Sequence, residues 1–199
     1  MLSNRSKVKN LEIFLLIAVL ISLSGGLAAD KSEPASSDEL STFKSAKQGD
    51  SDAQFSLGRK FWTGYILDKD INEALKWYRR AAAQGHVEAQ FHLGLIYGIG
   101  DEVEQDKTEA LKWYRMAADQ GHVRAQYFTG SMYDRGDGAE EDNTEALKWY
   151  RMAAEKGDPD AQYSIGSMYD TGDGVEQDKT EALKWYRMAA EKGDPDAQY

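Results

Sequence analysis

The most constraining feature of this sequence is a period of 36 residues that starts near residue 50 and continues to the end. Alanine, glycine and tryptophan recur at this spacing, as in Ala53, Ala89, Ala125, Ala161 and Ala197, in Gly58, Gly94, Gly130 and Gly166, and in Trp77, Trp113, Trp149 and Trp185. Such a period is typical of proteins built from similar units that bury their apolar faces by stacking. We expect units at 50–85, 86–121, 122–157 and 158–193, with a partial unit at 194–199.

Each unit contains the signals for two helices. In the clearest copy, Asp158 followed by Pro159 is typical of a helix start. Asp178 starts a second helix, where Glu181 predicts a capping box, and Gly193 is a typical end. Apolar residues recur every three or four positions, which is the helical spacing. The sequence therefore predicts an all-α fold of stacked antiparallel helix pairs.

The amino-terminal residues have the pattern of an export signal. A basic start is followed by the apolar run Leu11–Leu23 and by small residues, which predicts a signal peptide over 1–29 with cleavage after Ala28 or Ala29. An uncleaved membrane anchor is the alternative, although a spanning helix needs about 20 apolar residues.

Between the export signal and the repeats lie two short segments. Residues 30–37 are polar and contain Pro34, so we expect a tether there. The range 38–49 has acidic residues in its first turn and ends at Gly49, which predicts a capping helix before the first unit.

Composition excludes several kinds of partner and chemistry. The net charge of −10 disfavours nucleic-acid binding and favours a neutral or basic partner. Because the sequence has no cysteine, disulfides, thiolate metal sites and cysteine nucleophiles are excluded.

The repeated units resemble a known family. Residues Ala161–Gly193 read AQYSIGSMYDTGDGVEQDKTEALKWYRMAAEKG, and this pattern is similar to the Sel-1-like repeat, a relative of the tetratricopeptide repeat. The resemblance covers residues 50–199 and implies a right-handed α-solenoid that binds proteins or peptides. Many similar bacterial proteins are exported adaptors. Thr129 departs from the pattern, because leucine is usual there, and it should weaken core packing.

Analogy with tetratricopeptide units implies that the first helices line a concave binding face. The candidate binding residues on that face are Phe55, Arg59, Trp62, Phe91, Leu95, Tyr127, Ser131, Asp134, Tyr163, Ser167 and Asp170. Stacked aromatic side chains could bind an extended peptide or a helix. The alternative is that these aromatic rings are ordinary core residues, which burial would decide.

The sequence indicates no catalytic residue, metal site or cofactor. His86 and His122 occupy the position of Asp158 and are interpreted as polar residues at helix starts. The acidic loops do not match the ligand spacing of a calcium site. Ser41 and Lys44 fit the Ser-x-x-Lys pattern of penicillin-recognising enzymes, but the companion motifs Ser-Asp-Asn and Lys-Thr-Gly do not follow.

Together these observations predict an exported, non-enzymatic repeat scaffold for protein–protein or protein–peptide interaction. We expect it in the periplasm or outside the cell, as an adaptor or regulator in the bacterial envelope or at a host interface. Membrane attachment is expected only if the amino-terminal segment stays uncleaved. The alternatives are a penicillin-recognising, β-lactamase-like envelope enzyme and a membrane-tethered signalling regulator.

Overall fold

The structure is a computed structural model that describes residues 37–64 and 69–193. The predicted signal peptide, the tether up to residue 36, the partial unit 194–199 and the first-copy loop 65–68 lie outside the described residues. The helices are α2 (Ser37–Gln48), α3 (Ser51–Thr63), α4 (Ile71–Ala83), α5 (Val87–Ile99), α6 (Lys107–Asp119), α7 (Val123–Arg135), α8 (Asn143–Glu155), α9 (Pro159–Thr171) and α10 (Lys179–Gly193).

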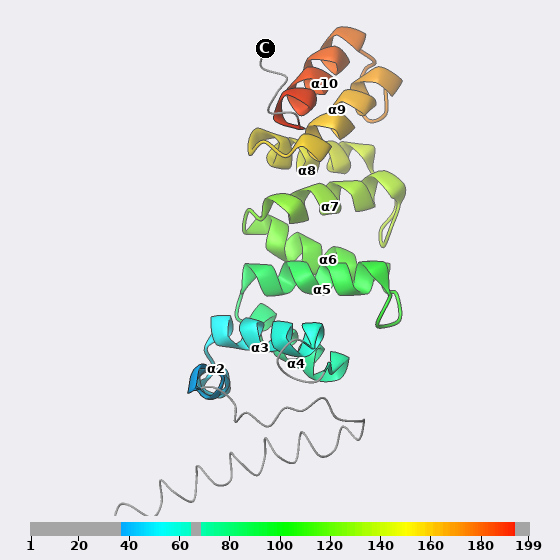
Figure 1. Ribbon diagram of the computed structural model, residues 1–199. Coiled ribbons are helices and arrows are strands. Elements are labelled where there is room, and N and C mark those ends of the chain that lie inside the picture. The colour runs from blue at the N-terminus through cyan, green and yellow to red at the C-terminus, as the bar shows by residue number, and fades with distance from the viewer. Residues whose placement is uncertain (1–36, 65–68, 194–199) are drawn as a thin grey trace, which may run out of the picture.

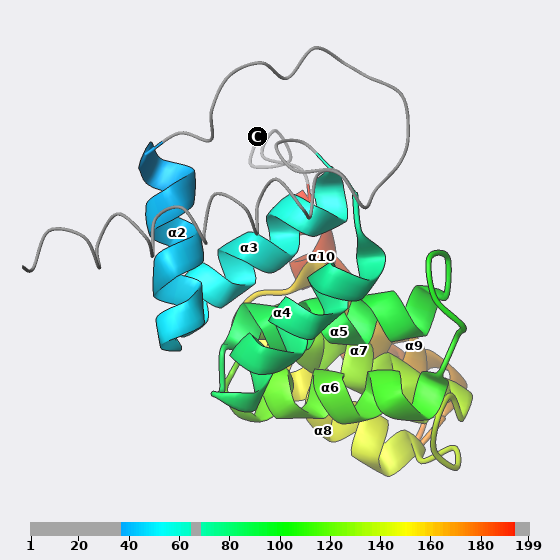
Figure 2. The ribbon, with the colours of Figure 1, turned by 90° about the horizontal axis from the view of Figure 1, so that it is seen from below.

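The helices form four antiparallel pairs that stack along one direction, from α3/α4 through α5/α6 and α7/α8 to α9/α10 (Figure 1). Seen from below, successive pairs are rotated relative to one another (Figure 2). Over 37–64 and 69–193 the chain contains helices and no strand, which confirms the predicted all-α solenoid. None of these described helices has the length and apolar character needed to cross a membrane.

The aspartate caps predicted for the second helices are present. Of the two hydrogen bonds of the predicted capping box, only the one that the aspartate side chain accepts is formed. The Asp106 carboxylate accepts a hydrogen bond from the Glu109 N–H at 2.9 Å. The Asp106 N–H, however, donates to the Tyr97 carbonyl at 3.0 Å. The Glu109 side chain instead accepts from Lys112. The reciprocal bond is replaced because the last turn of the first helix supplies a backbone acceptor.

Within each unit, a glycine of the first helix lies against a tyrosine of the second. A Cβ atom at Gly130 would lie 2.7 Å from Cδ1 of Tyr150, so a larger residue would force the ring to move. Gly58 and Tyr78 form the same contact in the first unit. Burial raises the pKa of Tyr78 from 10.0 to about 12. The absence of a side chain is therefore what allows the two helices to approach closely.

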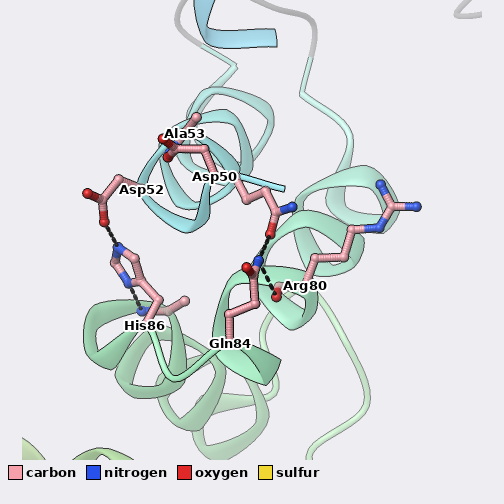
Figure 3. A network of polar contacts seen from close by, with 8 residues as sticks. Asp50, Asp52, Ala53, Arg80, Gln84 and His86 are labelled. Atoms are coloured by element: carbon pink, nitrogen blue, oxygen red, sulfur yellow. Dashed lines mark hydrogen bonds and ion pairs between the residues drawn. The ribbon is translucent and has the colours of Figure 1, made fainter. Parts of the chain in front are cut away.

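Between units, a buried glutamine ties each first helix to the preceding second helix. Gln90 donates through Nε2 to the Ala82 carbonyl at 3.1 Å. Its Oε1 accepts from Gln120 Nε2 at 2.7 Å. The first unit has the same arrangement, in which Gln84 donates to Gln54 at 2.8 Å (Figure 3). These bonds satisfy polar groups that the stacking would otherwise bury unpaired.

His86 and His122 are the N-caps of α5 and α7, and the sequence predicts this position at the helix starts. His86 Nδ1 accepts from the Ala89 N–H at 3.1 Å, and its Nε2 lies 3.3 Å from Oδ1 of Asp52 in the preceding first helix (Figure 3). His122 Nδ1 likewise accepts from a backbone N–H, and its Nε2 lies 3.3 Å from Oε1 of Glu88. Each ring is thus a helix cap that also contacts the neighbouring unit.

Helix α2 lies in the register of the repeat. Gln54 donates to the Ala46 carbonyl at 3.0 Å, which is the Gln90–Ala82 bond shifted by 36 residues. Gly49 follows α2 and has a φ of +103°. Its equivalent Gly85 follows α4 and has a φ of +87°. The segment for which the sequence predicts a capping helix is therefore a half unit that takes the place of a second helix.

Thr129 stands in the core position that leucine or isoleucine fills in the other units. Its side chain is fully buried, and its Oγ1 has no hydrogen-bond partner among the described residues. A buried hydroxyl without a partner is destabilising. The expected weak point in the packing thus has a structural basis.

Candidate functional site

Three of the four predicted aromatic positions take part in packing between units. The Phe91 ring lies 4.4 Å from that of His122 and 5.9 Å from that of Tyr114, measured between ring centroids. Phe55 and Tyr127 are also partly buried against the core. Tyr163 differs, because 61% of its surface is exposed. The three rings that pack against their neighbours therefore have less surface accessible to a ligand than the sequence suggests.

The polar candidates are spread over several environments. Arg59 is exposed and lies over the Phe55 ring, whereas Ser131 is buried. Asp134 accepts a hydrogen bond from the Tyr150 hydroxyl at 3.2 Å. Ser167 is partly buried and Asp170 is exposed. These residues differ in exposure and in their contacts, and their role in binding stays a prediction.

The structure brings Trp62 and Leu95 together at a hollow between α3, α5 and the loop that follows α5. The hollow has a volume of about 290 Å³ and is lined by Trp62, His92, Leu95, Ile96, Ile99, Asp101 and Glu102. Ile99 is 66% exposed, a large value for an aliphatic side chain. We call this feature the α3–α5 pocket. Its size suits one apolar side chain or a small group of a partner.

Sequence reasoning missed the other lining residues, although a signal for Ile99 was present; they are His92, Ile96, Ile99, Asp101 and Glu102. At its repeat position the other units carry Thr63, Arg135 and Thr171. Leu95 is also the apolar member of its set, whose other members are Arg59, Ser131 and Ser167. An apolar residue that replaces polar residues at an exposed repeat position indicates a local role that the common fold does not require.

Aromatic and acidic side chains are among those that line the pocket. The His92 ring stacks on Tyr78, with 5.7 Å between centroids and an interplanar angle of 12°. Burial is the main cause that lowers the pKa of His92 below 6.5, and Glu88 partly opposes it. Burial therefore favours the neutral form of the His92 ring. Of the two acidic lining residues, Glu102 pairs with Lys69 and Asp101 is exposed.

The part of the chain that the structure describes can be compared with the requirements of a metal site and of the penicillin-recognising pattern. No group of three or more His, Asp or Glu side chains converges there in a way that could hold a metal ion. Ser41 and Lys44, the pair that fits the penicillin-recognising pattern, are both exposed on α2.

The helices form antiparallel pairs that repeat every 36 residues. Buried glutamines form hydrogen bonds between neighbouring pairs, and a histidine or an aspartate caps each first helix. These features define an α-solenoid of short helical repeats. The Sel1 repeat profile matches residues 51–86, 87–122, 123–158 and 159–194. The chain belongs to the Sel1 repeat family, whose repeat is a non-catalytic scaffold typical of protein–protein interaction.

Solved structures agree with this assignment. A protective antigen of uropathogenic Escherichia coli with an SLR fold is 41% identical, with a TM-score of 0.75 over 78% of this chain and 33% of that chain. A Sel1 repeat protein from Oxalobacter formigenes is 37% identical, with a TM-score of 0.75 over 81% of this chain and 46% of that chain. This chain thus spans less than half the length of either protein. No curated protein matches it significantly.

Proposed function

We propose that this chain is an exported scaffold that binds a protein or peptide, with one apolar side chain of the partner held in the α3–α5 pocket. The observation that carries the proposal is Ile99, which exposes 66% of its surface beside Trp62 and Leu95. A few side chains near the centre of a contact, held in well-packed pockets, usually supply most of its binding energy. The role is that of an adaptor or regulator in the bacterial envelope or at a host interface.

The partner has a neutral or basic surface. Asp101 lines the pocket and is exposed, and the chain carries a net charge of −10. Opposite charge on the partner would speed association and fix its orientation, with an effect that decreases as salt increases.

Site-specific photo-crosslinking tests this proposal. A photoreactive amino acid at position 99 should give a crosslinked partner, and the same replacement at Thr171, the equivalent position two units later, should not. Ile99→Asp should abolish binding of the captured partner to the purified chain, whereas Thr171→Asp should preserve it. Equal crosslinking at both positions, or binding that Ile99→Asp leaves unchanged, would contradict a role for the pocket.

Export is proposed from residues 1–29, with their basic start and apolar run. Mass spectrometry of the mature amino terminus tests it, and a chain that begins at Ala29 or Asp30 is the expected result. A mature chain that retains residues 1–29 would instead favour a membrane-tethered protein.

We also propose that the chain is not an enzyme. Support comes from the missing companion motifs of the penicillin-recognising class and from the family's scaffold character. A labelled penicillin should therefore leave the wild-type chain unmodified. Covalent labelling that Ser41→Ala removes would overturn this part of the proposal.

A further inference from the structure

An arginine occupies the same repeat position in three successive second helices. Arg79, Arg115 and Arg151 are exposed on α4, α6 and α8, and each guanidinium donates a hydrogen bond to a tyrosine hydroxyl of the next unit. For Arg115 the acceptor is Tyr133, at 3.2 Å. For Arg151 it is Tyr169, at 3.0 Å. Because a phenol is uncharged, this bond orients the arginine side chain without neutralising its charge.

The acidic residues closest in sequence do not neutralise Arg115 and Arg151. Asp119 and Glu155 follow them by four positions, a spacing at which helical side chains can meet. Neither arginine, however, forms an ion pair with a carboxylate of residues 37–64 or 69–193. The lysine three residues before each of them does pair with a glutamate of its own helix. The two arginines therefore keep a positive charge that an external anion could bind.

An exposed methionine follows the arginine in the second and third units. Met116 is 37% exposed and Met152 is 40% exposed, whereas the first unit carries Arg80 at this position. Helix α6 packs on α5 and α7, and α8 packs on α7 and α9, so this exposure does not depend on an uncovered end of the stack. Methionine and arginine are both enriched where proteins bind one another. We call Arg115, Met116, Arg151 and Met152 the arginine–methionine surface.

The two kinds of side chain together indicate the chemistry of a partner. Guanidinium groups bind carboxylates and phosphates, and methionine contacts apolar groups. An acidic polysaccharide supplies anions without aliphatic side chains. An anionic bilayer supplies both, but its continuous negative charge would also face the exposed Asp119 and Glu155 of the same helices. A protein segment can place separate carboxylates at the arginines and avoid this repulsion.

We propose that the arginine–methionine surface binds an acidic segment of a second protein. Its Asp or Glu carboxylates pair with Arg115 and Arg151, and its apolar side chains contact the two methionines. Since the tyrosine hydroxyls already orient the guanidinium groups, less side-chain entropy is lost on binding. The surface is separate from the α3–α5 pocket, which favours a neutral or basic partner. The chain can thus hold two partners of opposite charge, as an adaptor does.

A labelled peptide of alternating glutamate and leucine tests the proposal by fluorescence anisotropy on the full chain. The net charge of −10 alone predicts repulsion of this peptide, so saturable binding requires a local surface that attracts it. Arg115→Gln/Arg151→Gln should weaken the affinity at least about tenfold. Lys112→Gln/Lys148→Gln is the matched control, because it removes two charges from the same helices. Since both lysines are exposed and already paired, it should change the affinity less than about twofold.

Further measurements separate the proposal from its alternatives. Met116→Gln/Met152→Gln should also weaken binding, and a peptide of alternating glutamine and leucine should not bind. Absence of saturable binding up to about 1 mM, or equal losses in the arginine and lysine variants, overturns the proposal. So does a lower Tm of the arginine variant with unchanged affinity, which would show that the arginines only connect neighbouring units. Binding to phosphatidylglycerol vesicles in place of the peptide, lost in the arginine variant, would overturn it in favour of a membrane.

Discussion

Helices α8 and α10 have almost the same sequence and very different surroundings. Leu147 in α8 is 6% exposed and Leu183 in α10 is 49% exposed, and Trp149 is buried while Trp185 is only partly so. Since the residues are the same, the difference comes from α9, which covers α8. In this molecule the local sequence determines that a helix forms, and the following unit determines how much of it is buried.

The other end of the stack supports the same conclusion. Helix α2 keeps the alanine that accepts from Gln54, but Thr42 stands where Tyr78 stands one period later. The half unit thus keeps the hydrogen bond with Gln54 of α3. It lacks the tyrosine ring that would face another first helix. The shortened unit packs on α3 at one end of the described chain, whereas no described helix packs on the corresponding side of α10 at the other.

The largest expected effect is a leucine-to-alanine change at the two equivalent positions. Leu147→Ala should lower the free energy of unfolding by about 3 kcal/mol, because it leaves a cavity beneath α9. Leu183→Ala should cost less than about 1 kcal/mol, since half of that side chain is already in water. Urea titrations followed by circular dichroism measure both values. Equal losses would show that α10 is as well covered as α8.

Glycine substitutions should show the same contrast with a smaller effect. At Gly130 and Gly166 a Cβ atom would lie 2.7 Å from a tyrosine Cδ1 in both units. Gly130→Ala should cost about 2 kcal/mol because Tyr150 is packed on all sides. Gly166→Ala should cost at least about 1 kcal/mol less, because the partly exposed Tyr186 can move away. The same urea titration tests this difference. Equal losses for the two substitutions would contradict the expectation that the Tyr186 ring can move away.

The third prediction concerns the buried hydroxyl of the third unit. Thr129→Val keeps the side-chain shape and removes an Oγ1 that has no partner among the described residues. It should raise the free energy of unfolding by about 1 kcal/mol. Thr171→Val, which changes an exposed hydroxyl, is the control and should not stabilise the chain. A destabilised Thr129→Val variant would show that the hydroxyl makes a favourable interaction.

The smallest expected effect depends on pH. Burial lowers the pKa of His92 in the folded chain below 6.5, so the unfolded chain binds more protons in mild acid. Stability from this group is therefore complete above pH 6.5 and is lost as the pH falls toward the folded pKa. His92→Phe copies Phe128, which stacks on Tyr114 in the next unit, and should remove that part of the acid loss. Thermal unfolding at pH 7.5 and pH 5.0 compares the variant with the wild type, and identical pH dependence would contradict this role.

The sequence predicts the repeated features of this molecule better than the single ones. The 36-residue period locates the helix pairs, their caps and the roles of His86 and His122, since local chemistry determines each of them. It does not predict that Phe91 packs against His122, because that depends on how neighbouring pairs are rotated. The α3–α5 pocket was missed for a similar reason. Its residues come from two units and a loop, and the repeat pattern alone does not show that Ile99 lies beside Trp62 and Leu95.

Hydrogen exchange in α8 and α10 tests the central claim most directly. The two helices have nearly the same intrinsic exchange rates because their sequences differ at one residue, and peptides that begin at Asn143 and Lys179 differ in mass. Coverage of α8 by α9 predicts that amides of residues 146–154 exchange at least about ten times more slowly than those of 182–190. Equal protection of the two helices would contradict the claim that the following unit supplies the burial of the one before it.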